Sequence, residues 1–340
     1  MNVKVNCGLR IADCGLIADR GLRIACCAVL AALTLHVGAR AQSLSYTKGQ
    51  NVAPAYEGWE QASDGTKYFL FGYMNRNWEE EIDVPVGPDN GFNVGGVDQG
   101  QPTRFLPRRN RFVFRVKVPA TFKEKDELVW TLTTHGKTEK AYATLRPDYI
   151  VDDVVRASET GALGAGTSSP EVRANKPPTL HVEEIKTRTL KVGEPLAVVS
   201  EVKDDGVPKR RAPSRATLQA AQERAAADPV LAAAIRNPSM SPPSRITVGK
   251  VVGLHVSWFL YRGPAGAKVT FDPPQVKVWE DTRAGANSPW APLWTPTPIP
   301  ADGRVPVTVI FSEPGTYVLR CRADDGALVA DEEVTIVVTK

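Results

Sequence analysis

The chain is poor in the residues that most often carry chemistry. Its 340 residues include five cysteines and four histidines. Four of the cysteines stand among the first 27 residues, and the fifth is Cys321. If the N-terminal segment is removed, as argued below, the remaining chain has no second cysteine for an intrachain disulfide or a cysteine metal cluster. Its folding must then rest on hydrophobic cores alone.

Sequence signatures of catalysis are also missing. The chain has no Gly-x-Ser-x-Gly nucleophile turn, no His-Glu-x-x-His metal motif and no glycine-rich phosphate loop. His135, His181 and His255 do not stand at metal-ligand spacing. We therefore predict a protein that is not an enzyme and has no cofactor. Carboxylates are numerous, so a glycosidase-like pair stays open as an alternative.

A strong charge of one sign is lacking once the N-terminus is set aside. The formal net charge is +4, and residues 1–41 hold five basic against two acidic residues, a surplus of three. The remainder of the chain therefore carries a net charge of about +1. Such a balance does not steer a protein onto nucleic acid or an anionic membrane, so we expect no nucleic-acid partner.

No apolar run is long enough for a membrane anchor. Ile24–Val37 follows Arg20 and Arg23, and it ends before Ala-Arg-Ala at positions 39–41. A basic start, a short apolar stretch and small residues at alternate positions are typical of a secretory signal peptide, whereas a membrane span needs roughly 20 apolar residues. We predict cleavage before Gln42, export to the periplasm or the exterior, and no stable transmembrane anchor.

A short repeat precedes this signal. Residues 7–13, 14–19 and 20–25 read Cys-Gly-Leu-Arg-Ile-Ala-Asp, Cys-Gly-Leu-Ile-Ala-Asp and Arg-Gly-Leu-Arg-Ile-Ala. Repetition of this kind has no structural purpose ahead of a signal peptide. We interpret residues 1–41 as a translated DNA repeat followed by the signal peptide, with the true start of translation downstream.

Residues 42–156 are predicted to form an N-terminal β-sandwich domain. Short apolar or alternating segments separated by turn residues are the pattern of a small antiparallel sandwich. The clearest alternation, in Arg111–Val118, directs Phe112, Phe114, Val116 and Val118 inward. The other expected strands are Lys67–Met74, Glu80–Val86, Glu127–Thr133 and Ala141–Leu145.

Two segments of this half lack the strand pattern. The Gly- and Asp-rich stretch between Pro88 and Pro102 is a long loop, and long loops in compact domains are often either functional or disordered. Residues 157–177 lose hydrophobic periodicity and turn to Gly, Ser and Pro, which predicts an interdomain linker.

Two charged strips are expected on the outer face of the N-terminal sheet. We expect a solvated face, on which the two strips can pair across the sheet, with an anionic-ligand site as the weaker alternative. The basic strip is Arg108, Arg109, Arg111, Arg115 and Lys117, and the acidic strip is Glu79, Glu81 and Asp83.

Residues 178–340 are predicted to form a second sandwich. Its closing hairpin, Gly315–Thr339, consists of two alternating segments joined by an Asp-Asp-Gly turn. Leu254–Tyr261 is expected to be the central strand, with Trp258 buried, and Tyr317 stands at the position of a tyrosine corner. A helical insertion at about residues 206–247 interrupts this half, and its Ala-rich composition predicts little buried area.

Two stretches resemble known families. Phe311–Leu319 is similar to the late strands of immunoglobulin-like and PKD-like modules in secreted bacterial proteins, which implies an immunoglobulin-like β-sandwich. Leu319 stands where antibody domains have cysteine, so the similarity is to members without that disulfide. Residues 75–85, Asn-Arg-Asn-Trp-Glu-Glu-Glu-Ile-Asp-Val-Pro, resemble a family of bacterial secreted proteins, which implies no activity.

Two sets of side chains are candidate sites. Trp279, Trp290 and Trp294 stand in a Pro-rich loop, where they would either form a stacking surface for glycans or peptides or pack over an open sheet edge. Two Asp-Asp-Gly turns are weak calcium candidates, because tight turns use the same residues and calcium needs six to eight oxygens. Their carboxylates belong to Asp204, Asp205, Asp324 and Asp325.

The sequence thus predicts an all-β chain of two antiparallel β-sandwich domains, 42–156 and 178–340, the second immunoglobulin-like. We expect an exported, non-enzymatic structural or interaction protein of the bacterial envelope or exterior, whose partner is a protein or a glycan. Two alternatives stay open. One is a glycan- or peptide-binding module that uses the tryptophan-rich loop 279–294, and the other is a carboxylate-based hydrolase.

Overall fold

The structure is a computed structural model that describes residues 47–162, 166, 168–185, 188–209, 219, 223, 250–278 and 297–340. These residues belong to one compact unit, Ser45–Lys340. The predicted signal peptide, most of the helical insertion and the tryptophan-rich loop lie outside the described residues. Within the described part, none of the helices has both the length and the apolar character that crossing a membrane requires.

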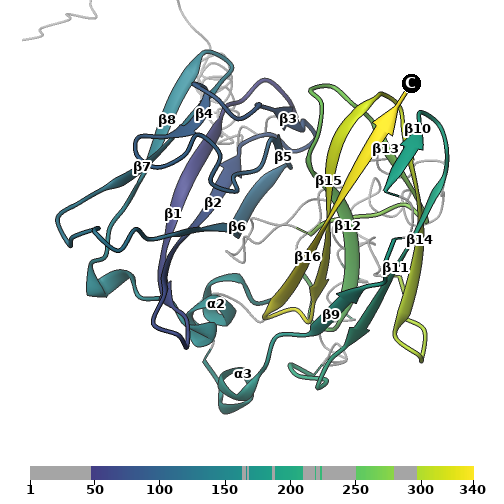
Figure 1. Cartoon of the computed structure of the whole chain (residues 1–340). Helices are drawn as coiled ribbons and strands as arrows, with labels where there is room; N and C mark the ends of the chain where they lie inside the picture. Colours follow the sequence, from purple (N-terminus) through teal and green to yellow (C-terminus); the bar gives the residue numbers. More distant parts are fainter. Residues whose placement is uncertain are drawn as a thin grey trace, which may run out of the picture. The chain divides into compact units, whose positions relative to one another are not determined.

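The N-terminal strands form two three-stranded sheets and a two-stranded one. Phe71 and Trp130 come from different sheets and meet edge to face, with ring centroids 5.8 Å apart, so a shared aromatic core joins the sheets. The first sheet holds β1 (Val52–Gln61), β2 (Lys67–Asn75) and β6 (Arg108–Lys117) (Figure 1). The second sheet holds β4 (Asn90–Phe92), β7 (Leu128–Thr134) and β8 (Lys137–Ala143). The two-stranded sheet holds β3 (Ile82–Asp83) and β5 (Arg104–Phe105).

Most of the predicted N-terminal strands are present, with shifted ends. The predicted strand Glu80–Val86 is much shorter than expected, since pairing stops at Asp83, two residues before a proline that cannot donate to a ladder. β1 was missed because Pro54 and Gly58 interrupt its apolar pattern, and its register shifts between Tyr56 and Gly58.

The C-terminal strands form two four-stranded sheets. Trp258, Tyr317 and Ile336 from one sheet share a buried core with Val309 and Phe311 from the other, so the pair of sheets is a sandwich. One sheet runs β10 (Thr189–Lys191), β16 (Val329–Thr339), β15 (Gly315–Asp324) and β12 (His255–Arg262), and the other β13 (Val269–Asp272), β14 (Arg304–Phe311), β11 (Leu196–Lys203) and β9 (Thr179–Val182).

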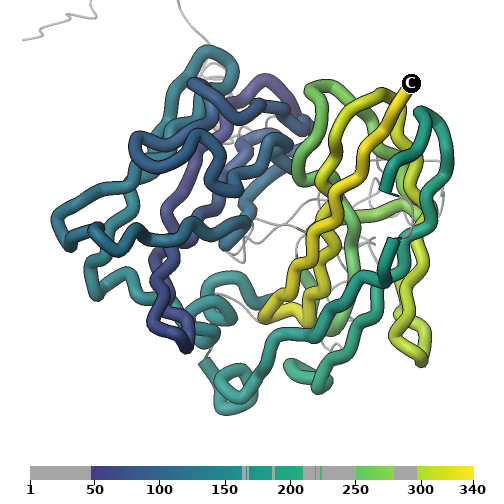
Figure 2. Tube along the Cα trace, viewed as in Figure 1, coloured from purple at the N-terminus to yellow at the C-terminus, as the bar shows by residue number. Residues whose placement is uncertain are grey.

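The all-β, mainly antiparallel fold predicted for the chain is confirmed, and the closing hairpin is its clearest element. β15 and β16 pair from Gly315 opposite Val338 to Asp324 opposite Val329. Figure 2 follows this hairpin, in yellow, to the C-terminus. Trp258 is buried as predicted, and the Tyr317 hydroxyl donates to the Glu313 carbonyl at 2.7 Å, which is the hydrogen bond of a tyrosine corner.

Two short helices of the described chain lie at the predicted linker, residues 157–177, and the first of them begins before it. α2 (Asp153–Thr160) begins at Asp152, whose side chain accepts from the Val155 N–H, and α3 (Pro170–Ala174) begins at a serine cap with proline in its first turn. Ala157 and Val172 from these helices pack with Ala327 and Leu328 at the β15–β16 turn. The segment is therefore attached to the C-terminal hairpin. Each helix contributes a single buried apolar residue to this contact, so the sequence shows no hydrophobic periodicity there.

Replacing Tyr317 with phenylalanine tests the tyrosine corner. The ring should keep its contact with Phe311, 4.6 Å between centroids, while the hydrogen bond to Glu313 is lost. We expect the free energy of unfolding to fall by about 1 kcal/mol, the usual net worth of one such bond. Urea unfolding measures it. Tyr142→Phe, at a half-exposed tyrosine, is the matched control, and equal losses in the two variants would contradict the assignment.

Candidate functional site

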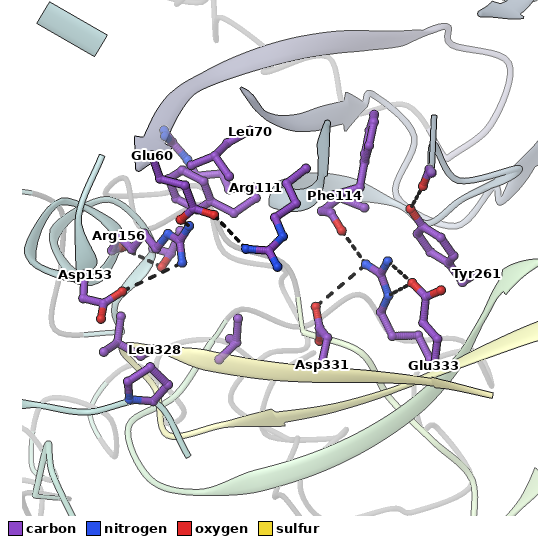
Figure 3. Close-up of a pocket in the computed structure, with 18 of the residues that line it drawn as sticks. Glu60, Leu70, Arg111, Phe114, Asp153, Arg156, Tyr261, Leu328, Asp331 and Glu333 are labelled. Atoms are coloured by element: carbon purple, nitrogen blue, oxygen red, sulfur yellow. Dashed lines mark hydrogen bonds and ion pairs between the residues drawn. The ribbon is translucent and has the colours of Figure 1, made fainter. Parts of the chain in front are cut away.

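A cavity of about 530 Å³ opens where β6 and α2 face β12, β15 and β16. It is within the usual size range of small-molecule sites. Figure 3 shows side chains that line it, with Glu60, Arg111 and Arg156 on one wall and Asp331 and Glu333 on the other. Strands and a helix supply both walls of this cavity, and we take it as the candidate site.

A β-bulge in β6 shapes one wall. Phe71 pairs with Phe114 and Tyr73 with Asn110, so three residues of β6 oppose the single Gly72 of β2. A side chain at Gly72 would collide with the Asn110 carbonyl, since a Cβ there would lie 2.4 Å from that oxygen. The bulge therefore depends on a glycine in the neighbouring strand.

The bulge also moves Phe112 from its predicted place. We expected it to point inward with Phe114, Val116 and Val118, but the extra residues break the alternation and Val113 is buried instead. Phe112 has φ +49°, in the left-handed region that L-residues avoid, and its partly buried ring lines the cavity.

Glu60 at the end of β1 organises the charges beside α2. It accepts from Arg115 at 3.3 Å and from Arg156 of α2. Arg156 also lies 3.8 Å from Asp153, one helical turn away. Arg111 forms an ion pair with Glu159 at 2.6 Å. These pairs fix the long side chains of β6 and α2 against one another along one wall.

Arg320 of β15 organises the opposite wall. Its guanidinium lies 3.6 Å from the centroid of the Tyr261 ring and donates to the Val113 carbonyl of β6 and to Glu333 of β16. Asp331 lies 3.8 Å away. Burial raises the pKa of the Tyr261 hydroxyl to about 12. Burial alone would lower the pKa of Arg320, but Tyr261, Asp331 and Glu333 raise it, so the guanidinium stays charged.

The Gly- and Asp-rich loop forms the rim. Asp98 receives two 2.8 Å hydrogen bonds from the Arg262 guanidinium, and the Gly100 carbonyl accepts from the Tyr261 hydroxyl. The Arg262 hydrogen bonds hold the pKa of Asp98 below its usual range. Long loops are often functional or disordered, and this one is held by β12.

The strong ion pairs of the acidic and basic strips run to residues outside the two strips, which differs from our prediction. The acids Glu81 and Asp83 instead bind Arg104 of β5, at 3.1 and 2.8 Å. Arg104 also donates to the Ala267 carbonyl at 2.9 Å, and Asp83 accepts from the Gly266 N–H at 2.8 Å.

The residues of the basic strip bind carboxylates of β1 and α2. Arg109 and Arg111 bind Glu57, Arg111 binds Glu159, and Arg115 binds Glu60. The prediction failed because the alternation of polar and apolar residues along a strand indicates which side chains share a face, but it does not indicate which strand lies beside them.

The turn of the closing hairpin contains a buried charged group. Asp324 is fully buried and lies 3.1 Å from the Lys250 ammonium and 3.9 Å from His255. Its pKa is lowered despite burial because the Lys250 ammonium, with a smaller contribution from His255, favours the carboxylate. Burial lowers the pKa of His255 itself. Asp325 accepts from the Asn175 amide at 2.9 Å and from two backbone N–H groups of the turn, and burial raises its pKa to about 6.

The other sequence candidates fall in different places. Asp204 and Asp205 accept from the backbone N–H groups of Gly206 and Val207, as turn residues do. Asp324 likewise accepts from the Gly326 N–H. No group of three or more metal-ligating side chains occurs among the described residues. Trp279, Trp290 and Trp294 lie outside those residues, so their role stays a prediction.

Arg320, Tyr261 and Arg262 were not singled out from the sequence, although a signal exists. In the β15–β16 hairpin, Arg320 stands opposite Glu333 and Arg322 opposite Asp331. Counting outward from the Asp-Asp-Gly turn would have given these cross-strand pairs. No sequence signal indicates that Arg320 also reaches β6.

Comparison with known proteins adds little. No family model matches the chain, and the search of curated proteins found no match. Among solved structures, the chain is similar to a chimeric titin Z1Z2 functionalized with an exogenous decorin peptide, with 9% sequence identity over 86% of this chain and 99% of that one and a TM-score of 0.19. It is similar to the Yersinia pseudotuberculosis adhesin InvE, with 10% identity over 86% of this chain and 60% of that one and a TM-score of 0.21. It is also similar to the D00-D0 domain of intimin, with 10% identity over 84% of this chain and 100% of that one and a TM-score of 0.20. Scores this low support no inference about activity or partners.

The raised pKa of Asp325 predicts an inverted pH response. The folded state binds this proton more tightly than the unfolded chain, whose carboxyl has a pKa near 3.8, so ionisation of Asp325 costs stability as pH rises toward and through 6. From pH 5 to pH 7 we expect Asp325 to lower the free energy of unfolding by about 1 kcal/mol. Urea unfolding of the wild type and of Asp325→Asn at both pH values isolates this effect, and an identical pH dependence in the two proteins would refute it.

Proposed function

We propose that this chain is an exported, non-enzymatic structural or interaction protein of the bacterial envelope or exterior. The observation that carries the proposal is the way the N-terminal and C-terminal strands interlock. Tyr261 belongs to β12 yet packs into the N-terminal core, and Arg320 of β15 donates to the Val113 carbonyl of β6. Two sandwiches fastened in this manner make a stiff module suited to holding or presenting a partner.

The chemistry of the charged groups supports the non-enzymatic part of the proposal. The arginines that line the cavity use their charge on carboxylates of the same chain, as Arg320 does with Glu333 and Arg262 with Asp98. Catalytic groups, by contrast, are held with pKa values matched to proton transfer and with reactive atoms directed at a substrate. A glycan- or peptide-binding role of loop 279–294 and a carboxylate-based hydrolase activity are the alternative hypotheses.

Export is supported by the basic, short apolar and small-residue pattern of residues 20–41. A tag fused after Lys340 would extend from an exposed C-terminus. In the native host we expect the tagged protein in the envelope fraction or the medium, beginning at Gln42. Full-length protein in the cytosol would contradict the proposal.

The stiffness of the module can be tested at Arg320. Arg320→Ala removes a buried cation and leaves the Val113 carbonyl and the Tyr261 ring without their partner, so we expect a loss of about 3 kcal/mol in the free energy of unfolding and faster proteolysis. Arg304→Ala is the matched control, since Arg304 pairs with Glu183 on the exposed surface and its removal should leave the stability nearly unchanged. Equal effects of the two substitutions would show that Arg320 does not couple the two halves.

A further inference from the structure

We propose that the cavity between β6, α2, β12, β15 and β16 is a binding site for a short neutral saccharide. The proposal goes beyond the structural role above, because a stiff module needs no ligand. It also concerns residues other than the tryptophan-rich loop. Three properties of the cavity wall support it: its charge balance, its exposed hydrogen-bonding groups and the strained Phe112.

Ion pairing within the chain disfavours a strongly charged ligand. Each cation among the described lining residues has a carboxylate partner. Arg115 and Arg156 pair with Glu60, Arg320 with Glu333, Arg111 with Glu159, Arg262 with Asp98, and Lys250 with Asp324. An anionic ligand would compete with these carboxylates for the arginines, and a cationic ligand would compete with the arginines for the carboxylates. A neutral ligand leaves every pair intact.

The same pairs offer many hydrogen bonds to a neutral polar ligand. A guanidinium has five N–H donors and a carboxylate has two acceptor oxygens. One ion pair therefore uses only some of the N–H donors and some of the oxygen lone pairs. Several of these side chains are accessible, with exposed fractions of 59% for Arg115, 54% for Asp153 and 44% for Glu333. Hydroxyl groups both donate and accept, and a ring that carries several of them matches a wall that alternates donors and acceptors.

Phe112 supplies the apolar part of the site. Its ring is partly exposed on the cavity wall, with the Arg156 guanidinium 5.6 Å from the ring centroid. The left-handed backbone is costly for phenylalanine, and strained residues cluster where function requires a particular placement. An aromatic ring fixed at the edge of a polar cavity is suited to pack against the C–H face of a sugar ring.

An extended peptide is the competing occupant, and the geometry of β6 disfavours it. β6 is an edge strand of its sheet, and Arg111–Arg115 line the cavity. A peptide strand would need a regular edge to pair with, but the bulge interrupts β6 there and Arg320 already occupies the Val113 carbonyl.

A glycan array probed with the purified full chain tests the proposal, followed by calorimetric titration with the best neutral oligosaccharide. We expect binding to neutral glycans and no gain from sulfate or sialic acid. Phe112→Gly should weaken binding at least tenfold, while the unfolding midpoint changes little, because relief of the left-handed backbone offsets the lost ring contacts and the greater freedom of glycine in the unfolded chain. Tyr142→Ala, at an exposed tyrosine outside the cavity, should leave both the affinity and the midpoint unchanged.

Three results would overturn the inference. The wild type could bind no neutral glycan, it could bind acidic glycans alone, or the Phe112→Gly variant could keep the full affinity. Enrichment of peptides from a displayed library that Phe112→Gly does not recognise would assign the cavity to a peptide instead. None of these results bears on export or on the effect of Arg320→Ala, so the proposed function would stand or fall separately.

Discussion

The buried guanidinium of Arg320 is the contact on which the arrangement of this molecule depends. It stacks on Tyr261, pairs with Glu333 across the closing hairpin and donates to the Val113 carbonyl on an N-terminal strand. A buried cation is tolerated only where its hydrogen bonds are satisfied, so the N-terminal strand and the hairpin are both required to keep this one in place. Aromatic packing of Tyr261 in the N-terminal core adds a hydrophobic contact at the same point.

Loops and short helices extend this attachment. Asp98 in the Gly-rich loop holds Arg262, Arg104 reaches the Ala267 carbonyl, and Asn175 after α3 donates to Asp325 in the hairpin turn. Each contact joins segments far apart in sequence, and most are charge-assisted hydrogen bonds, which are stronger than neutral ones. The strands supply two apolar cores, while the polar contacts fix how those cores are connected.

The candidate cavity is a consequence of the same polar contacts. Each wall is held by its own ion pairs, and the hydrogen bond from Arg320 to the Val113 carbonyl joins the two walls beside a space lined by accessible polar groups. The bulge that places Phe112 on this wall requires Gly72 in the next strand, where a Cβ would strike the Asn110 carbonyl. Shape and charge at the cavity therefore arise together from a few positions of β2, β6 and β15.

Local patterns in the sequence determined the elements whose side chains alternate and whose turns are short. The closing hairpin, the burial of Trp258 and the Tyr317 corner follow from period-two alternation and from the turn chemistry of Asp-Asp-Gly, both of which act within a few residues. Only the tertiary structure decided the partners of Arg104, Arg115 and Arg320, the bulge at Phe112 and the docking of α2. All of these features depend on which strands become neighbours. The alternation of polar and apolar residues along a strand specifies its two faces, but it carries no information about which segment packs against each face.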